Sequence, residues 1–331
     1  MNAGRAVGLL LGVAADAAFG DPRRGHPVAG FGRVAGALER RIYQDRRSAG
    51  VVFTGVLVGG SVALGLAARR LGRLSPVAEA ATTALTTWVV LGGASLAEEG
   101  TTMARALDSG ALAEARESLP RLCGRSPGSL DGPGLARASV ESIAENTSDA
   151  VVAPLFWGAV AGVPGLLGYR AINTLDAMVG HRSPRYRRFG WASARLDDVA
   201  NLLPSRATAM LTSLCAPVVG GSAQGAWRTW RRDATAHPSP NAGQVEAAFA
   251  GALEVRLGGR TVYHHGTEER PMLGDGRTPD AGDVTRGVEL SRVIGAVAGV
   301  LSAATAVAIG QGLRRRPGRR RGALRGGGTQ R

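Results

Sequence analysis

The chain has 331 residues, of which 44% are hydrophobic and 5% aromatic, and its formal net charge is +14. All 40 basic residues are arginine, and the absence of lysine excludes a Walker-type phosphate loop and pyridoxal phosphate chemistry, because both need a lysine. The two cysteines, Cys123 and Cys215, have neither the number nor the spacing of a disulfide framework or a zinc site.

Six segments are apolar over nearly the 20 residues that a helix needs to cross a bilayer. They are 3–20, 51–68, 77–97, 150–168, 207–223 and 293–311. Two of them are weaker, since Pro154 and Pro164 interrupt 150–168, and both 150–168 and 207–223 can be re-entrant or lie within a helical bundle. The pattern predicts an all-α, polytopic helical integral membrane protein with polar helical segments between the spans, built as a single domain over 1–312.

The first polar block, residues 19–28, is a stiff loop that holds Asp21 and His26. Two X-Pro steps restrict the backbone on both sides of these residues. A single histidine is more often structural than catalytic, but a rigid loop with an acid and a histidine at a helix end is a reasonable binding element.

Three acidic residues, Glu141, Glu145 and Asp149, recur every four positions. On a helix they share one face and repel one another unless a cation lies opposite. Mg²⁺ is the natural candidate, because one or two carboxylates and substrate phosphates commonly hold it. A solvated acidic helix face is the alternative; the amide of Asn146 and the apolar run that follows favour the metal site.

Asn173 and Asp176 precede a cluster of arginines. The cluster consists of Arg182, Arg185, Arg187 and Arg188. Arginine forks suit phosphate oxygens, so that the block predicts anion binding. Lipid headgroups beside the membrane are the alternative ligand, but they leave Asn173 and Asp176 without a role.

The next block is Asp197, Asp198 and Asn201, followed by Arg206. On a helix both aspartates neighbour Asn201, and the group can offer oxygens to a second metal position or hydrogen bonds to a nucleotide. Capping of a helix by one aspartate is an equally good interpretation of the spacing. Arg206 can neutralise a phosphate.

The last polar block, 237–248, is a proline-bracketed loop that opens a helix and contains His237, Asn241 and Glu246. The amides of a helix N-terminus favour anions. Ordinary helix capping by Ser239 or Asn241 is the alternative.

The tail, residues 313–331, carries eight arginines and no acid. We expect it to be disordered and to face membrane lipid. Nucleic-acid binding is not expected, because no aromatic residues are present in the tail to stack on bases.

In this order, the polar blocks resemble the CobD/CbiB family of cobalamin biosynthesis, the adenosylcobinamide-phosphate synthases. The matching motifs are Gly-Asp-Pro and His-Pro-Val within 20–28, Glu-Ser-Ile-Ala-Glu-Asn-Thr-Ser-Asp at 141–149, Asn-Thr-Leu-Asp-Ala-Met-Val-Gly at 173–180, Leu-Asp-Asp-Val-Ala-Asn-Leu-Leu-Pro-Ser-Arg at 196–206 and Pro-Asn-Ala-Gly-Gln-Val-Glu at 240–246.

The resemblance implies a multi-pass enzyme of the cell membrane with a cytoplasmic active site. It implies ATP-dependent amide ligation of (R)-1-amino-2-propanol, or its O-phosphate, to the propionate of adenosylcobyric acid. ATP is then a substrate, Mg²⁺ the metal ion, and other late cobalamin-pathway membrane enzymes possible partners.

The chemistry of the side chains suggests a role for each candidate. The expected catalytic residues are Glu141, Glu145, Asp198 and His237. The expected metal ligands are Glu145, Asp149, Asp197 and Asp198. The expected substrate-binding residues are Asp21, His26, Asn146, Asn173, Asp176, Arg182, Arg185, Arg206, Asn241 and Glu246.

Two other functions compete with a ligase. A membrane transporter for a carboxylated or phosphorylated solute would place its polar residues within the spans, whereas here they lie mainly between the apolar segments. A membrane-anchored interaction protein would leave the acidic and amide motifs without a purpose.

Overall fold

The computed structural model describes residues 2–21, 25–181, 183–263 and 266–314. Within these ranges the regular structure is helical apart from one β-hairpin, which confirms the all-α prediction. Of the predicted tail, only residues 313 and 314 belong to the described part, at the end of the last helix; residues 315–331 lie outside it.

The helices and strands are given below in chain order within each class. The α-helices are α1 (Asn2–Phe19), α2 (Pro27–Ile42), α3 (Arg47–Gly72), α4 (Pro76–Val90), α5 (Gly93–Asp108), α6 (Leu112–Leu122), α7 (Gly132–Asn146), α8 (Ala153–Ala161), α9 (Val163–Leu175), α10 (Tyr186–Phe189), α11 (Trp191–Ala200), α12 (Leu202–Cys215), α13 (Ala223–Asp233), α14 (Ala242–Leu253) and α15 (Ala281–Arg314). The short 3-10 helices are η1 (Pro127–Ser129), η4 (Ala216–Val219) and η5 (Ala234–Ala236), and the π-helical segments are η2 (Thr147–Val152) and η3 (Asp176–Gly180). The strands β1 (Leu257–Tyr263) and β2 (Gly266–Leu273) pair in antiparallel fashion.

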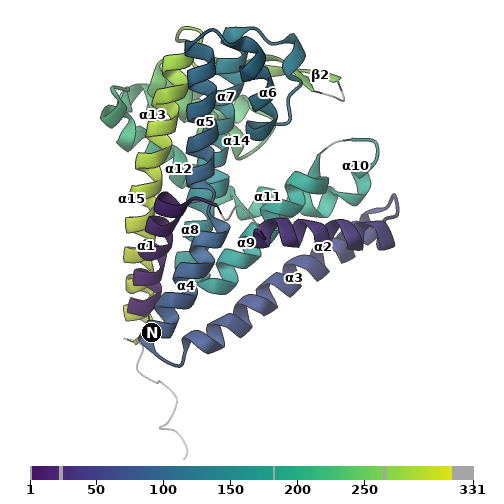
Figure 1. Ribbon diagram of the computed structural model, residues 1–331, viewed down its shortest axis with the longest axis vertical. Helices are drawn as coiled ribbons and strands as arrows, with labels where there is room; N and C mark the ends of the chain where they lie inside the picture. The colour runs from purple at the N-terminus through teal and green to yellow at the C-terminus, as the bar shows by residue number, and fades with distance from the viewer. Residues whose placement is uncertain (1, 22–24, 182, 264–265, 315–331) are drawn as a thin grey trace, which may run out of the picture.

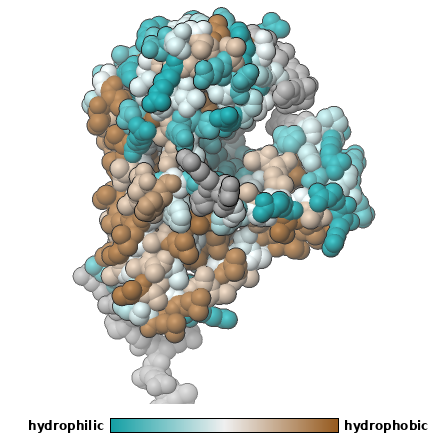
Figure 2. Space-filling view, in the orientation of Figure 1, coloured by the Kyte–Doolittle hydropathy of each residue, from teal (hydrophilic) through white to brown (hydrophobic). Residues whose placement is uncertain are grey.

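Four helical stretches among the described residues are long and apolar enough to cross a membrane. They are Arg47–Gly72, Pro76–Asp108, Leu202–Val219 and Ala281–Gly312. In Figure 1, α15 runs along the long axis of the molecule, with α1 and α4 beside its lower half and α5 beside its upper half. Figure 2 shows hydrophobic residues gathered on the lower half of this face and hydrophilic residues on the upper part. The chain is therefore a helical membrane protein.

Two predicted spans, 3–20 and 150–168, are not among these four stretches. Segment 150–168 is divided at Gly162, whose φ of 70° suits glycine alone among common residues, so that α8 and α9 form a hairpin. Segment 3–20 forms α1, and its charged residues Arg5 and Asp16 are buried against the rest of the protein.

The upper part is built around α14, every residue of which is buried. Alanine and glycine dominate this helix because its neighbours approach closely: a Cβ atom at Gly251 would lie 2.7 Å from Cβ of Thr229 on α13. Phe249 and Leu253 continue the same core toward α7 and α15, where Ile143 and Val288 are also buried.

Helices α2, α3, α10 and α11 form an arm that projects to one side of the molecule (Figure 1). Its core contains Phe53, Leu57, Val179 and Phe189, and the rings of Phe53 and Phe189 lie 5.0 Å apart. Figure 2 shows a notch between the hydrophilic upper part and this arm. The polar blocks of the sequence meet where α7, η2 and α14 of the upper part approach η3 and α11 of the arm.

Candidate functional site: an acidic cavity

Five carboxylates from separate segments of the chain line one cavity of about 90 Å³. The lining residues are Glu145, Ser148, Asp149, Asp176, Asp197, Asp198, Asn201, Ser239, Asn241, Ala242 and Val245. The structure therefore brings together parts of four sequence blocks that are separated by as many as 100 residues.

Two π-helical segments deliver acidic residues to this cavity. Helix α7 ends at Asn146 and continues as η2, which contains Asp149, while α9 continues as η3, which begins at Asp176. π-Helical turns are rare and occur frequently at functional sites. Gly180 at the end of η3 leaves room for the carboxylate, because a Cβ atom there would collide with Oδ1 of Asp176.

Amide and hydroxyl donors orient some of the carboxylates. Nδ2 of Asn173 donates to Oδ2 of Asp149 at 3.5 Å, and Nδ2 of Asn201 donates to Oδ2 of Asp197 at 3.0 Å. The hydroxyl of Tyr169 in turn donates to Oδ1 of Asn201 at 2.8 Å. Oδ1 of Asp197 remains buried without a hydrogen-bond partner among the described residues.

No basic side chain is among the described residues that line the cavity, so its carboxylates are not neutralised there. Burial, followed by repulsion from Asp197 and the other carboxylates, raises the pKa of Asp149 well above its usual range, and the pKa of Asp176 is raised to about 7 for the same two reasons. Burial also raises the pKa of Asp197 to about 6 and raises that of Glu145. Such a concentration of acids needs either protons or a cation from outside the chain.

The donor set suits Mg²⁺, a hard cation that binds carboxylate and amide oxygens. The buried, unpartnered oxygens Asp197 Oδ1 and Ser148 Oγ support this fit. Among the described residues no three acidic, histidine or cysteine side chains are already placed to hold one ion. Proteins commonly hold Mg²⁺ with one or two carboxylates, and water and phosphate oxygens complete its shell.

His237 and Glu246 lie beside the cavity in a second buried group. Glu246 is 1% exposed, and its carboxylate lies 3.8 Å from a guanidinium nitrogen of Arg270 and 3.9 Å from Nε2 of His237. Burial and then repulsion from Glu141 raise the pKa of Glu246 well above its usual range, while burial and the charge of Arg270 lower the pKa of His237. Ser239 N–H donates to Nδ1 of His237 at 3.1 Å, so that this histidine also shapes the loop before α14.

Glu141 has a different environment from Glu145, although one helical turn separates them. One oxygen of Glu141 pairs with Arg125, and the other accepts a hydrogen bond of 2.7 Å from the backbone N–H of Gly258. Both oxygens are therefore occupied, and Glu141 ties the hairpin to α7.

Asn241, Asp198 and Arg206 lie at the junction of α11, α12 and α14. Nδ2 of Asn241 donates to the backbone oxygen of Asp198 at 2.8 Å, and its Oδ1 accepts from Ser205. The Asp198 carboxylate pairs with Arg195 at 3.3 Å. Arg206 donates to the backbone oxygen of Leu202 at 2.8 Å and does not line the cavity.

The N-terminal loop makes local contacts. Oδ2 of Asp21 accepts from the Ser95 hydroxyl at 2.7 Å, and Nδ1 of His26 accepts from the Val28 N–H at 3.1 Å, which caps α2. Nε2 of His26 lies 3.8 Å from Oδ1 of Asp21. Neither residue lines the acidic cavity.

Two further candidates, Asn146 and Arg185, do not line the cavity. Asn146 donates to the backbone oxygen of Ser142 at 2.9 Å. Arg185 pairs with Glu39 at 2.9 Å on the arm. Arg182 lies outside the described residues.

Sequence reasoning missed three arginines. Arg125 and Arg270 pair with Glu141 and Glu246, and Arg170 acts on Asp149 by lowering its pKa against the effect of burial. Arg170 had a signal in the sequence, because it is the lone charge in the apolar run 163–172. The other two gave none, since nothing in the local sequence indicates which acid each one meets.

Comparison with known proteins extends over nearly the whole chain. The model of the CobD/Cbib protein family matches residues 9–291. Proteins named cobalamin biosynthesis protein CobD from Mycobacterium tuberculosis, Geobacter metallireducens and Chromobacterium violaceum are 60%, 44% and 44% identical to this chain. The alignments cover 90%, 82% and 92% of this chain and 95%, 87% and 96% of those proteins. No solved structure matches. The chain belongs to the CobD/CbiB family and has a role in cobalamin biosynthesis.

Proposed function

We propose that the protein is an adenosylcobinamide-phosphate synthase, an acid–amine ligase. It would join the propionate of adenosylcobyric acid to the amine of (R)-1-amino-2-propanol O-phosphate, or of the free alcohol, with hydrolysis of ATP. Family membership supports the pathway, and the acidic cavity supports the reaction class.

The observation that carries the proposal is the meeting of five carboxylates in one cavity next to the notch between the upper part and the arm. An ATP-dependent ligation has to neutralise phosphate charge, and Mg²⁺ bound with the nucleotide would supply that neutralisation. Asp149 and Asp197 are the best placed to hold the ion, because both are inward-facing and orienting amides of Asn173 and Asn201 contact them.

The amine substrate arrives protonated and has to lose a proton before it can attack. Asp176 suits the role of general base, because its pKa of about 7 lies near neutral pH. Glu246 and His237 form a second buried pair that can accept or relay a proton beside the cavity. Glu141 would act indirectly, by holding the hairpin that carries Arg270 close to Glu246.

We place the cavity on the cytoplasmic side of the cell membrane, where ATP is available. Its acidic residues lie outside the four candidate spans, which favours an enzyme over a transporter with ion sites at the bilayer midplane. Association with other late-pathway membrane enzymes would shorten the path of a corrinoid that several of them handle in turn.

The direct test is a ligation assay with the full chain in lipid nanodiscs. The reaction would contain adenosylcobyric acid, ATP, Mg²⁺ and aminopropanol with or without its phosphate, and products would be identified by mass. We expect a corrinoid product that requires both ATP and Mg²⁺, and the preferred amine would define the substrate. Folded protein that forms no product with either amine would refute the proposal, and vesicle uptake of the amine without product would support a transporter.

A further inference from the structure

A second, larger cavity lies between α5 and α15 and has a volume of about 570 Å³. This is within the usual size range of small-molecule sites. The two cavities meet different sides of η2, since Val151 lines the larger one and Ser148 and Asp149 line the acidic one. None of the proposed reaction steps uses the larger cavity.

Small residues create the space between the two helices. Gly93, Ala94 and Ala97 on α5 face Gly295 and Ala296 on α15. These walls are apolar, so that a ligand with a short carbon chain would remove apolar surface from water. Small residues alone do not indicate which ligand binds. The charged side chains at the two ends of the cavity indicate its chemical class.

Asp16 lies at one end of the cavity and is 6% exposed. Its Oδ2 accepts a hydrogen bond of 3.1 Å from the N–H of Ala94 at the start of α5. Its Oδ1 has no hydrogen-bond partner among the described residues. A buried carboxylate oxygen without a donor is costly, and an ammonium group would satisfy it in both charge and hydrogen bonding.

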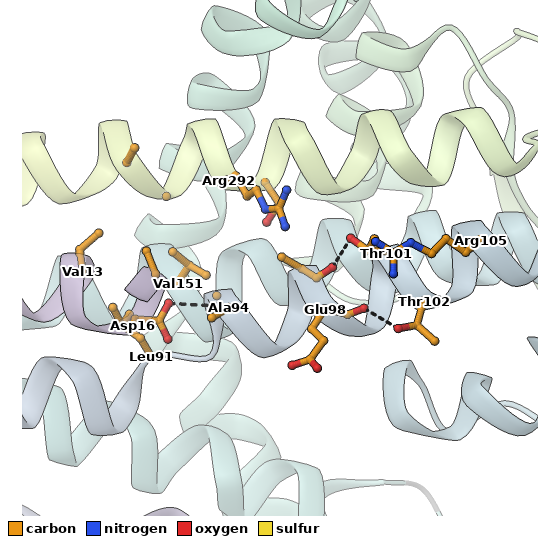
Figure 3. A pocket seen from close by; sticks show the side chains of 16 residues that line it. Val13, Asp16, Leu91, Ala94, Glu98, Thr101, Thr102, Arg105, Val151 and Arg292 are labelled. Atoms are coloured by element: carbon orange, nitrogen blue, oxygen red, sulfur yellow. Dashed lines mark hydrogen bonds between the residues drawn. The ribbon is translucent and has the colours of Figure 1, made fainter. Parts of the chain in front are cut away.

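Two arginines mark the other end. In Figure 3, Arg292 extends from α15 and Arg105 from α5 toward the space between the helices, with Asp16 at the far side. Arg292 donates to Glu289 at 2.6 Å, which occupies Nη1 of its guanidinium. Arg105 makes no side-chain hydrogen bond or ion pair with a residue that the structure describes. Two guanidinium groups that approach from opposite helices suit the oxygens of a phosphate.

We propose that this cavity binds a primary-amine phosphate, with the ammonium group at Asp16 and the phosphate at Arg105 and Arg292. The long arginine side chains can adjust to the length of the ligand without movement of the helices. Two sources share this chemistry: a soluble aminoalkyl phosphate and the headgroup of an aminoethyl phospholipid. The lipid can enter because both helices belong to candidate membrane spans. The inference goes beyond the proposed ligation, since binding requires neither nucleotide nor corrinoid.

Isothermal titration of the detergent-solubilised full chain with phosphoethanolamine, in the absence of ATP and corrinoid, tests the site. Inorganic phosphate and ethanolamine serve as half-ligands, and each should bind at least about tenfold more weakly than the joined molecule. Asp16→Asn and Arg292→Gln should each weaken binding of phosphoethanolamine about tenfold or more. Glu98→Gln is the matched control, because Glu98 lines the same cavity but Figure 3 shows its carboxylate on the side of α5 away from α15; this variant should bind normally.

Equal affinity for inorganic phosphate and phosphoethanolamine would overturn the proposal, and so would normal binding by Arg292→Gln. If Asp16→Asn does not fold, because Asp16 also caps α5, Arg292→Gln alone tests whether the cavity binds the ligand. Mixed micelles distinguish the sources: displacement of phosphoethanolamine by phosphatidylethanolamine but not by phosphatidylcholine supports the lipid. Absence of displacement, together with tight binding of aminopropanol phosphate, supports the soluble ligand. Because the titration contains no ATP, a failure of ligation and a failure of this site give separate results.

Discussion

Glu141 and Glu145 occupy the same face of α7 one turn apart, yet they belong to regions of opposite character. Glu141 belongs to a satisfied ion pair with Arg125 and also accepts a backbone hydrogen bond. Glu145 lines the acidic cavity, where loss of hydration raises its pKa while the charges of Arg270 and Arg125 act in the opposite direction. The first region stabilises the fold, and the second concentrates negative charge that protons or a cation from outside the chain must neutralise.

The comparison teaches that helical spacing predicts which side chains meet, but not what they meet. A carboxylate with two partners inside the protein is available to nothing else. A carboxylate that no side chain of the protein pairs with is available to a cation or a proton.

The largest expected effect is on stability, from Glu141→Gln. Removal of one partner of a buried ion pair typically costs about 3–5 kcal/mol, so that this variant should unfold at a clearly lower temperature in detergent. Glu145→Gln, measured without Mg²⁺ at neutral pH, should unfold at the same temperature as the parent protein or higher, because it removes a partly dehydrated charge and breaks no hydrogen bond or ion pair with a described residue. Equal destabilisation by both substitutions would show that the two regions do not differ.

A second expected effect separates two adjacent aspartates, of which the sequence favoured Asp198 as both a catalytic residue and a metal ligand and Asp197 as a metal ligand only. Asp197 points into the cavity with an unpartnered oxygen, whereas the carboxylate of Asp198 pairs with Arg195 and is partly exposed. Asp197→Asn should lower the rate of ligation about a hundredfold or more, and Asp198→Asn less than about tenfold. Thermal unfolding of both variants is the control, and the reverse order of activities would contradict the assignment of Asp197 as the inward ligand.

The smallest effect is the pH dependence of stability. Asp176 and Asp197 have folded-state pKa values of about 7 and about 6, both raised above the usual value for aspartate. Between pH 4 and 7 the folded protein therefore binds more protons than the unfolded chain, and the stability that these groups contribute is lost as the pH rises through 7. The unfolding temperature should fall by about a few degrees between pH 5 and 8. Mg²⁺ should reduce the fall, as should Asp197→Asn; a curve that Mg²⁺ does not alter would argue against metal binding in the cavity.

Much of the acidic cavity could be predicted from the sequence. Glu145 and Asp149 came from a four-residue spacing, and Asp197 and Asn201 from the same rule on another helix. Such local patterns are reliable because helical geometry fixes which side chains are neighbours. The all-α class and the spans around 51–68, 77–97, 207–223 and 293–311 followed from length and hydropathy in the same way.

Long-range pairings could not be predicted. No property of residues 120–145 indicates that Arg125 lies against Glu141 and leaves Glu145 free, and no property of His26 distinguishes a helix cap from a ligand. For segment 150–168 the sequence left open a span, a re-entrant segment and a place within a helical bundle, because hydropathy does not register the positive φ at Gly162 that folds it into a hairpin. The hairpin of β1 and β2, which meets α7 through Gly258, is likewise a tertiary feature.

The two π-helical segments that end α7 and α9 have a further consequence. Each accommodates more residues per turn than an α-helix, and Asp149 and Asp176 lie in these widened turns. Loss of one residue from either segment would restore α-helical geometry there and re-aim the side chains of the widened turn. At these two places the spacing of the chain matters more than its composition: variants that exchange side chains can keep the architecture of the cavity, whereas a single-codon deletion would turn its acids away from one another.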